Sequence, residues 1–154
     1  MDAVTVNNQN VQLEGRTVIM DTGAVVFVCI YRCSVDRFSG TTLLIVPPAD
    51  ATAIHNLIPG ANSDGQGGFT VPCTVNATVA LTFAGIQFNI DPRDLAFQPI
   101  DPTNPQGDCT SGIASGAVGG ATEWLAGDVF LKNVYFGTDA TDKTLSLAQL
   151  VQST

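Results

Sequence analysis

Short runs of β-branched and apolar residues, separated by turns rich in Gly, Asn and Pro, form the hydrophobic pattern of this chain. Residues 77–83 alternate apolar with smaller or polar side chains, which is typical of a strand with one buried face. Residues 3–6 and 11–13 flank an Asn-rich stretch that tolerates the left-handed backbone of a hairpin turn. Further strands are predicted at 16–20, 41–46, 69–73, 86–90, 109–113, 134–136 and 144–148. The pattern predicts an all-β, mainly antiparallel fold.

The strand at 16–20 carries β-branched residues on both faces, which favours a place inside a sheet rather than at its edge. Only two short helices are predicted, at 49–57 and at 129–133, the second capped by Asp128. Residues 91–107 contain four of the eight prolines and are predicted to form a long loop. The lone His55 has no partner in the sequence, so we expect it at the surface or at the helix end rather than as a catalytic base.

The length of 154 residues fits a single domain that can bury a core of its own. Asp and Glu number 14 against 6 Lys and Arg, a net charge of −8, which argues against nucleic acid or an anionic membrane surface as a partner. The longest uncharged apolar run, residues 24–31, is too short for a membrane-spanning helix. No signal peptide is visible at the beginning of the sequence.

Residues 24–40 differ in texture from the rest of the chain, because they begin with a β-prone uncharged run and contain two of the four cysteines. Cys29 and Cys33 lack the spacing and the further ligands of a zinc site, so no metal site is expected. Asn76 begins an Asn-Ala-Thr triplet, an acceptor for N-glycosylation that matters if the chain enters a secretory pathway.

Asp21-Thr22-Gly23 follows directly after the apolar run 17–20. A carboxylate at the end of a buried strand, with a tight turn behind it, is held rigidly and aimed in one direction. The same triplet also fits an ordinary Asx-type turn. The motifs elsewhere in the chain favour the functional interpretation.

Together these motifs resemble the C-terminal lobe of a pepsin-like aspartic peptidase, most similar to the secreted fungal members. They are residues 18–23 continued by 41–44, Cys73 and Cys109 in the order of that lobe's disulfide, residues 124–131, and the terminal hairpin at 134–148. The resemblance covers nearly the whole chain except 24–40. It implies one lobe of a bilobal fold, so residues 1–154 would form a single partial domain, and a Cys73–Cys109 disulfide, which fits an oxidising compartment.

In this family each lobe contributes one Asp-Thr-Gly loop, and the two carboxyls share a proton and the water that attacks the scissile carbonyl. By resemblance, Asp21 is the second catalytic carboxylate. Two carboxyls a few Å apart do not both ionise, so an acid pH optimum follows. The residues implied in support of the catalytic loop are Thr22, which bonds across to the partner loop, Gly23, which permits the turn, Thr41, which bonds the outer oxygen of the carboxylate, and Leu125, Ala126 and Gly127, which thread beneath the loop.

The resemblance therefore implies an aspartic endopeptidase that cuts peptide or protein substrates between bulky apolar residues and uses no cofactor. We expect its partner to be an N-terminal lobe with the first catalytic Asp, and the parent protein to be secreted or vacuolar. Alone, the chain is expected to have little or no activity, and residues beside Asp21 would obstruct self-pairing. The alternative is a non-catalytic peptidase-like β module that binds protein or carbohydrate, or a relic.

Residues 24–40 separate Gly23 from Thr41, which the catalytic loop needs side by side. Deleting these 17 residues restores an uninterrupted Asp-Thr-Gly-Thr-Thr-Leu-Leu motif. Our hypothesis is that the insert is a translated short intron, and the alternative is a genuine surface loop.

Overall fold

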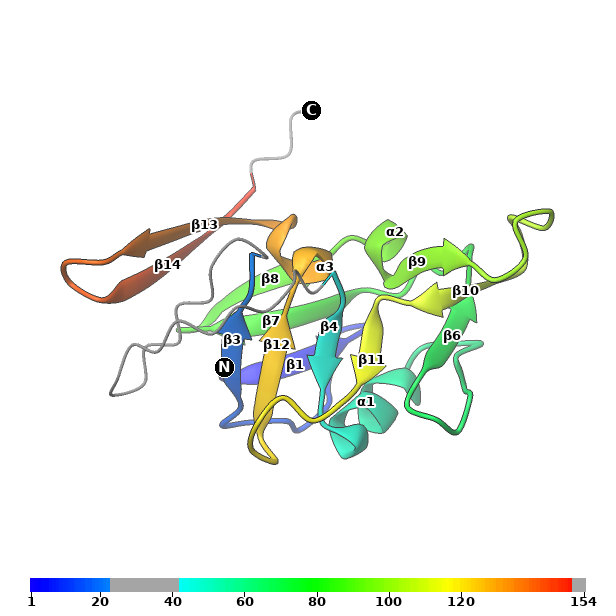
Figure 1. Ribbon diagram of the computed structural model, residues 1–154, viewed down its shortest axis with the longest axis horizontal. Coiled ribbons are helices and arrows are strands. Elements are labelled where there is room, and N and C mark those ends of the chain that lie inside the picture. The colour runs from blue at the N-terminus through cyan, green and yellow to red at the C-terminus, as the bar shows by residue number, and fades with distance from the viewer. Residues whose placement is uncertain (23–41, 151–154) are drawn as a thin grey trace.

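The computed structural model describes residues 1–22 and 42–150 (Figure 1). Within these residues the chain is mostly β-sheet with three short helices. The strands are β1 (Ala3–Val6), β2 (Gln9–Asn10), β3 (Thr17–Met20), β4 (Leu44–Val46), β5 (Asn62–Ser63), β6 (Phe69–Pro72), β7 (Val79–Phe83), β8 (Ile86–Ile90), β9 (Ala96–Pro99), β10 (Asp108–Ser111), β11 (Ile113–Ser115), β12 (Glu123–Ala126), β13 (Val134–Asp139) and β14 (Thr144–Gln149). The helices are α1 (Pro48–His55), α2 (Pro92–Leu95) and α3 (Asp128–Leu131).

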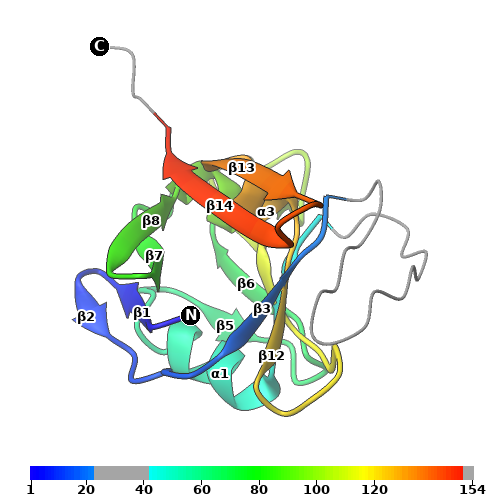
Figure 2. The ribbon, with the colours of Figure 1, turned by 90° about the vertical axis from the view of Figure 1, so that its left-hand side faces the viewer.

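The strands form three four-stranded sheets and one hairpin, in the orders β2-β1-β7-β8, β5-β6-β10-β9, β11-β4-β12-β3 and β13-β14. Figure 2 shows the sheet of β1, β7 and β8 on one side of the molecule and β3 with β12 on the other, and the hydrophobic core lies between such layers. Trp124 and Phe130 are the largest fully buried side chains. The predicted all-β class is confirmed.

The sheet β11-β4-β12-β3 is mixed, with β12 parallel to β3 and antiparallel to β4. β3 lies at the end of this sheet and pairs with β12 alone among the described strands, so the expectation of an interior strand was wrong. Burial rises along β3 rather than alternating, because Thr17 is exposed, Val18 and Ile19 are half-buried and Met20 is buried. A strand with apolar residues on both faces can thus lie at a sheet edge.

The first hairpin is shorter than the pattern predicted. β1 pairs with β2 in the register Thr5↔Asn10 and Val6↔Gln9, so the turn consists of Asn7 and Asn8. Both have positive φ, 51° and 64°, the left-handed backbone that Asn tolerates. Residues 11–13, predicted as the second strand, lie beyond this pairing.

The helices also differ from the predictions. α2 lies within the predicted loop 91–107, where Asp91 accepts a hydrogen bond from the Arg93 backbone N–H and Pro92 begins the helix. In α3 the N-cap is Gly127, and Asp128 stands in the first turn without a capping hydrogen bond. α1 spans Pro48–His55, whereas the predicted helix was 49–57, so it begins one residue earlier and ends two residues earlier than predicted.

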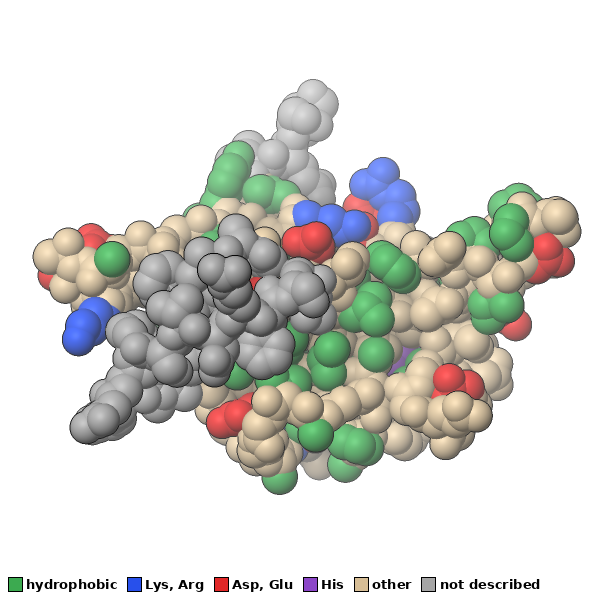
Figure 3. All heavy atoms as spheres, in the orientation of Figure 1, with side chains coloured by type: hydrophobic (Ala, Val, Ile, Leu, Met, Phe, Trp, Pro, Cys, Tyr) green, Lys and Arg blue, Asp and Glu red, His purple; other side chains and the backbone are tan. Residues whose placement is uncertain are grey.

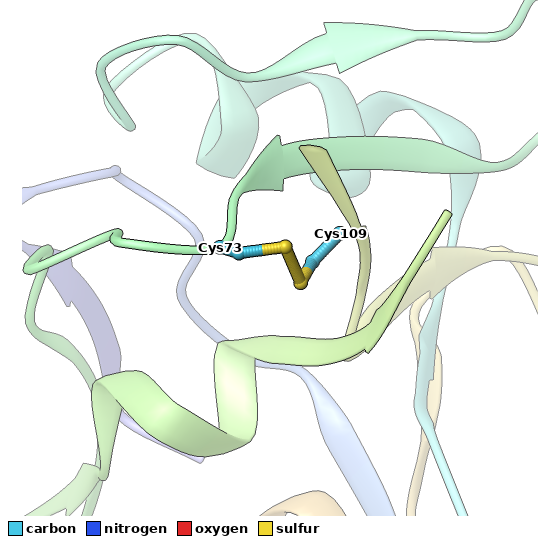
Figure 4. The surroundings of a disulfide bond; sticks show 2 residues. All are labelled: Cys73 and Cys109. Atoms are coloured by element: carbon cyan, nitrogen blue, oxygen red, sulfur yellow. A yellow bond between two sulfur atoms is a disulfide. The ribbon is translucent and has the colours of Figure 1, made fainter. Parts of the chain in front are cut away.

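Cys73 and Cys109 form a disulfide across a sequence separation of 36, with their Cα atoms 4.9 Å apart (Figure 4). The bond ties the end of β6 to β10, which already pair antiparallel with Cys109 opposite Val71. The predicted pairing is present.

The terminal hairpin of β13 and β14 is as predicted and projects from one end of the molecule, while the β9–β10 connection projects from the other (Figure 1). Basic side chains are sparse on the face shown in Figure 3. None of the helices in the described ranges is long and apolar enough to cross a membrane.

Candidate active site

Asp21 comes directly after β3 and is fully buried, with 0% of its surface exposed. Its backbone N–H donates to the carbonyl oxygen of Ala126 at 2.9 Å, which extends the parallel β3–β12 ladder by one residue. The register places Met20 opposite Ala126. The carboxylate is therefore carried by the rigid end of a paired strand, as the position after an apolar run predicted.

The segment after β12 is held from its other side by the chain that leads into β4. The Gly127 N–H donates to the Leu43 carbonyl oxygen at 3.2 Å, and the Val129 N–H donates to that of Thr42 at 2.9 Å. The end of β12 thus lies between Asp21 on one side and residues 42–43 on the other. The structure thus places Asp21 beside Ala126, with Gly127 directly after Ala126 in the chain.

The other predicted loop residues are placed as follows. Leu125 is 8% exposed and pairs with Ile19 of β3 and Ile45 of β4. Thr22 is exposed at the end of the first described range. Gly23, Thr41 and the insert 24–40, with Cys29 and Cys33, lie outside the described residues.

α3 follows directly after Gly127 and anchors this strand end to the core. The N–H groups of Phe130 and Leu131 both donate to the Gly127 carbonyl oxygen at 3.0 Å. Val129 and Phe130 are buried. The chain beside Asp21 is therefore fixed by a helix as well as by strands on both sides.

An ionic network around the buried Asp50 links β3 and β12 to α1. The guanidinium of Arg16, just before β3, donates to both carboxylate oxygens of Asp50 in α1, at 2.7 and 2.9 Å. The Trp124 indole Nε1–H in β12 donates to Asp50 Oδ2 at 2.8 Å. Asp50 thus joins α1 to the two strands that position Asp21.

Asp50 is 2% exposed, so its charge needs these partners. Burial by itself raises the pKa of the Asp50 carboxyl, but the hydrogen bonds from Arg16 and Trp124 outweigh it and hold that pKa below its ordinary value. Sequence reasoning missed this network, because Arg16 and Asp50 are 34 residues apart and no local pattern links them.

His55 is the last residue of α1, at the helix end as expected, but it is buried rather than at the surface, with 4% exposure. Its Nδ1 lies 2.8 Å from the Ala51 carbonyl oxygen, and its Nε2 lies 2.8 Å from Ser111 Oγ. The carbonyl can only accept, which places the proton on Nδ1 and makes the Ser111 hydroxyl the donor to Nε2. Ser111 Oγ also accepts from the Ile113 N–H at 3.1 Å.

The His55 ring stacks on Phe69, with centroids 3.9 Å apart. Burial lowers the pKa of the imidazole, against the opposing effect of the hydrogen bond to Ala51. Through Phe69 and Ser111, His55 joins α1 to β6 and β10. No sequence pattern linked His55 to Ser111, which lies 56 residues further along the chain. His55 is a structural residue of the core.

No group of three or more His, Cys, Asp or Glu side chains that could hold a metal ion occurs within 1–22 and 42–150. At the ends of β3 and β12 the structure places the carboxyl group of Asp21, whose backbone N–H is hydrogen-bonded to Ala126. Asn76, the predicted glycosylation acceptor, is exposed in the loop between β6 and β7.

Comparison with known proteins identifies the family to which this arrangement belongs. The family model for eukaryotic aspartyl proteases matches residues 1–150, so the chain belongs to this family, and its fold is one lobe of the pepsin-like fold. It is 36% identical over 148 residues, 96% of the chain, to a probable aspartic-type endopeptidase CTSD of Trichophyton verrucosum, of which it covers 25%.

Two further relatives show the same relation. The chain is 35% identical over 149 residues, 96% of its length, to the aspartic-type endopeptidase ctsD of Aspergillus fumigatus, of which it covers 27%. It is 34% identical over 99 residues, 63% of its length, to rhizopuspepsin of Rhizopus chinensis, of which it covers 23%. The chain spans about a quarter of the length of these curated relatives.

Proposed function

We propose that this chain supplies the second catalytic carboxylate, Asp21, of a two-lobed aspartic endopeptidase. The observation that carries the proposal is a fully buried Asp at the end of β3, fixed by its backbone to Ala126, in a chain of the aspartyl protease family. The position suits catalysis, because a catalytic group works best when its own backbone is rigid.

The proposed chemistry needs a second carboxyl close to Asp21. When two carboxyls lie a few Å apart, ionisation of the first disfavours ionisation of the second, so the pair holds one proton at acid pH. The ionised member takes a proton from water as that water attacks the peptide carbonyl, and the protonated member donates to the carbonyl oxygen. In this proposal the partner carboxyl comes from an N-terminal lobe.

An apolar row on the mixed sheet supports a partner at this face. Leu44 and Val46 point into the core, so Ile45 between them points to the opposite face of the sheet. The register places Leu125 beside Ile45 and Ile19, and Ala114 beside Ile45. Hydrophobic side chains gather over β4 and β11 on the face shown in Figure 3. Such a row favours contact with another apolar surface.

The test compares the chain alone with a longer protein that joins it to the region encoded upstream. We expect the longer protein, made without residues 24–40, to cut peptides at acid pH with pepstatin sensitivity, and the chain alone to be inactive. Asp21→Asn should lower kcat/KM by about a thousandfold or more. Asp128→Asn is the matched control, because Asp128 is an exposed carboxylate in the first turn of α3, directly after Gly127. Equal activity of the Asp21→Asn variant and its parent would overturn the proposal.

We further propose that the parent enzyme works in a secreted or vacuolar compartment and cuts between bulky apolar residues. The Cys73–Cys109 disulfide supports an oxidising compartment. The specificity rests on the family alone, and a peptide library digested by the two-lobed protein measures it directly.

We also propose that residues 24–40 are a translated intron, and the described strands on either side support this. Met20 and Leu44 both lie opposite Ala126, on its two sides, so they are about two strand spacings or roughly 10 Å apart. Without the insert six residues would join them, which reach about 20 Å when extended. The strands can therefore keep their places when the insert is deleted.

Sequencing the mature transcript across codons 23–41 tests this origin. An intron is expected to be spliced out in the message that directs an active enzyme. A spliced message that retains the insert, from a gene with measurable peptidase activity, would show that residues 24–40 are a genuine part of the protein.

A further inference from the structure

The Asn76-Ala77-Thr78 triplet is the one Asn-X-Ser/Thr sequence in the chain with a residue other than Pro at its centre. It lies in the connection between β6 and β7, three residues after the disulfide-bonded Cys73. Asn76 and Thr78 are exposed, whereas Ala77 between them is 3% exposed and packs in the core. The two side chains that an oligosaccharyltransferase reads thus face solvent in the folded lobe.

The backbone around Asn76 is held at both ends. Before it, the Val75 N–H donates to the Pro72 carbonyl oxygen at 2.9 Å. After it, Asn7 Oδ1 accepts from the Thr78 N–H at 3.1 Å, and the Asn7 N–H donates to the Thr78 carbonyl oxygen at 2.8 Å. The amide of Asn76 is therefore presented from a fixed position, and a group attached to it would contact a defined surface.

That surface is a shallow pocket of about 330 Å³ beside the acceptor amide. Its apolar part comes from two prolines and from Val75 and Ala77, and its polar part from Asn and Thr side chains at the rim. The lining residues are Asn7, Pro59, Pro72, Thr74, Val75, Asn76 and Ala77. The size lies at the lower end of the range for small-molecule sites, about 300 to 1,000 Å³.

A sugar ring suits this combination of groups. A hexosamine has one face of C–H groups, which packs on apolar side chains, and a rim of hydroxyl and amide groups, which hydrogen-bonds to Asn and Thr. Because Asn76 is itself part of the pocket lining, the first sugar attached to it starts at the pocket rather than reaching it from elsewhere.

We propose that Asn76 carries an N-linked glycan whose first N-acetylglucosamine lies in this pocket. A bond forms between Asn76 Nδ2 and C1 of the sugar, and the bond from C1 to the diphosphate of a lipid-linked oligosaccharide donor breaks. The amide loses one proton, and the lipid diphosphate leaves with the electron pair of the broken bond. The proposal rests on the secretory compartment proposed above, and it does not depend on catalysis.

The pocket is separate from the candidate active site in the fold. None of its lining residues belongs to β3, β4, β11 or β12, the strands that position Asp21. A glycan at Asn76 therefore leaves the catalytic edge of the lobe accessible, and we expect Asn76→Gln to keep the peptidase activity of the two-lobed protein unchanged.

The modification is tested on protein purified from its own organism, by peptide mass and by the gel shift on treatment with peptide N-glycosidase. In a parallel translation with microsomes, we expect one glycan on the parent chain and on Thr78→Ser, and none on Asn76→Gln or Thr78→Ala. An unmodified Asn76 in the native protein would overturn the proposal. If the microsomes also add no glycan, the Asn76 triplet is a poor acceptor. If they do add one, the native protein does not pass through a glycosylating compartment.

The seating of the sugar is tested by trimming the glycan to a single N-acetylglucosamine with an endoglycosidase. We expect the trimmed protein to keep the Tm of the fully glycosylated form, and complete removal to lower the Tm by about 2–4 °C. In Val75→Ser, which removes apolar surface from the pocket, this difference should disappear. An equal Tm for the trimmed and sugar-free proteins would show that the first sugar does not pack on the pocket.

Discussion

At the scale of single residues, the most consequential side chain outside the catalytic loop is Asp50. Asp50 lies in α1 and is almost fully buried. Its carboxylate accepts hydrogen bonds from Arg16, which directly precedes β3, and from Trp124 in β12. An isolated buried carboxylate would be strongly unfavourable, so the three groups are stable only together. The network thereby ties the position of the helix to the strands that aim Asp21.

Replacing Arg16 by Met should destabilise the lobe by about 3 kcal/mol at neutral pH, because a buried charge loses its partner. The folded-state pKa of Asp50 lies below its unfolded value, so this stabilisation is present above about pH 4 and is lost as the pH falls through the folded pKa. Urea unfolding at pH 7 and near pH 2.5 measures both effects, and the difference between variant and parent should shrink at the lower pH.

Lys132→Met is the matched control for this prediction. Lys132 pairs with Asp94, but its side chain is 52% exposed, against 21% for Arg16. An exposed ion pair contributes at most about 1 kcal/mol. Equal losses in the two variants would contradict a special role for the Arg16–Asp50 pair.

His55 also makes the lobe less stable as the pH falls, but its effect begins at a higher pH than that of Asp50. Burial lowers its folded-state pKa below the unfolded value, so the unfolded chain binds more protons and stability falls as the pH drops below about 6.5. We expect His55→Gln to lose less stability than the parent between pH 7.5 and pH 5. Equal losses by urea unfolding over this interval would show that His55 stays neutral in both states or is protonated in both.

At the scale of elements, β12 organises the site. It is the strand that pairs with β3 and with β4, so the chain before residue 22 and the chain after residue 42 are brought to its two sides. The segment that follows it, with Gly127 at the start of α3, passes between them. The long connection 21–43 is therefore anchored at both ends by one strand.

Deleting residues 24–40 should leave the sheet intact and stabilise the lobe. The connection between Met20 and Leu44 would shorten from 23 to 6 residues. The entropic cost of closing this loop on folding would then fall by about 1 kcal/mol. The expected rise in Tm is about 2–4 °C for a domain of this size, with an unchanged far-ultraviolet circular dichroism spectrum. A lower Tm on deletion would argue for a genuine surface loop.

At the scale of the whole molecule, β6 and β10 are held together both by strand pairing and by a disulfide. β6 and β10 are hydrogen-bonded neighbours, and the Cys73–Cys109 bond closes the chain between them (Figure 4). In the chain-entropy model such a cross-link acts on the unfolded state, because it removes conformations that the open chain can adopt.

The double variant Cys73→Ser/Cys109→Ser should lose about 3 to 4 kcal/mol of unfolding free energy, the value for a loop of this length. Chemical denaturation with and without reductant measures the loss, and reductant should have no further effect on the variant. A free Cys73 in folded, secreted protein, detected by alkylation, would contradict the pairing.

The sequence predicted the features that depend on local pattern and motif order. The strand at 79–83, the terminal hairpin and the position of Asp21 after an apolar run were all predicted from local pattern. The single buried face expected of 79–83 was wrong, because Val79, Ala80 and Leu81 are all buried. The disulfide followed from the order of motifs in the family. Local capping signals were less reliable, because α2 was missed and Asp128 was wrongly taken for a cap.

Only the tertiary structure decided which strands lie beside β12, why β3 ends the sheet, and how His55 and Asp50 come to be buried. Each of these depends on a partner 34 to 106 residues away in the chain, such as Ser111 for His55 or Glu123 for Thr17. A local pattern records whether a side chain is apolar and with what period, whereas the choice of partner is made by the packing of the whole core. The sequence by itself therefore determined the family, many of the strands and the place of Asp21 after an apolar run. It missed β9 and β12, and the fold determined what holds the Asp21 backbone in position.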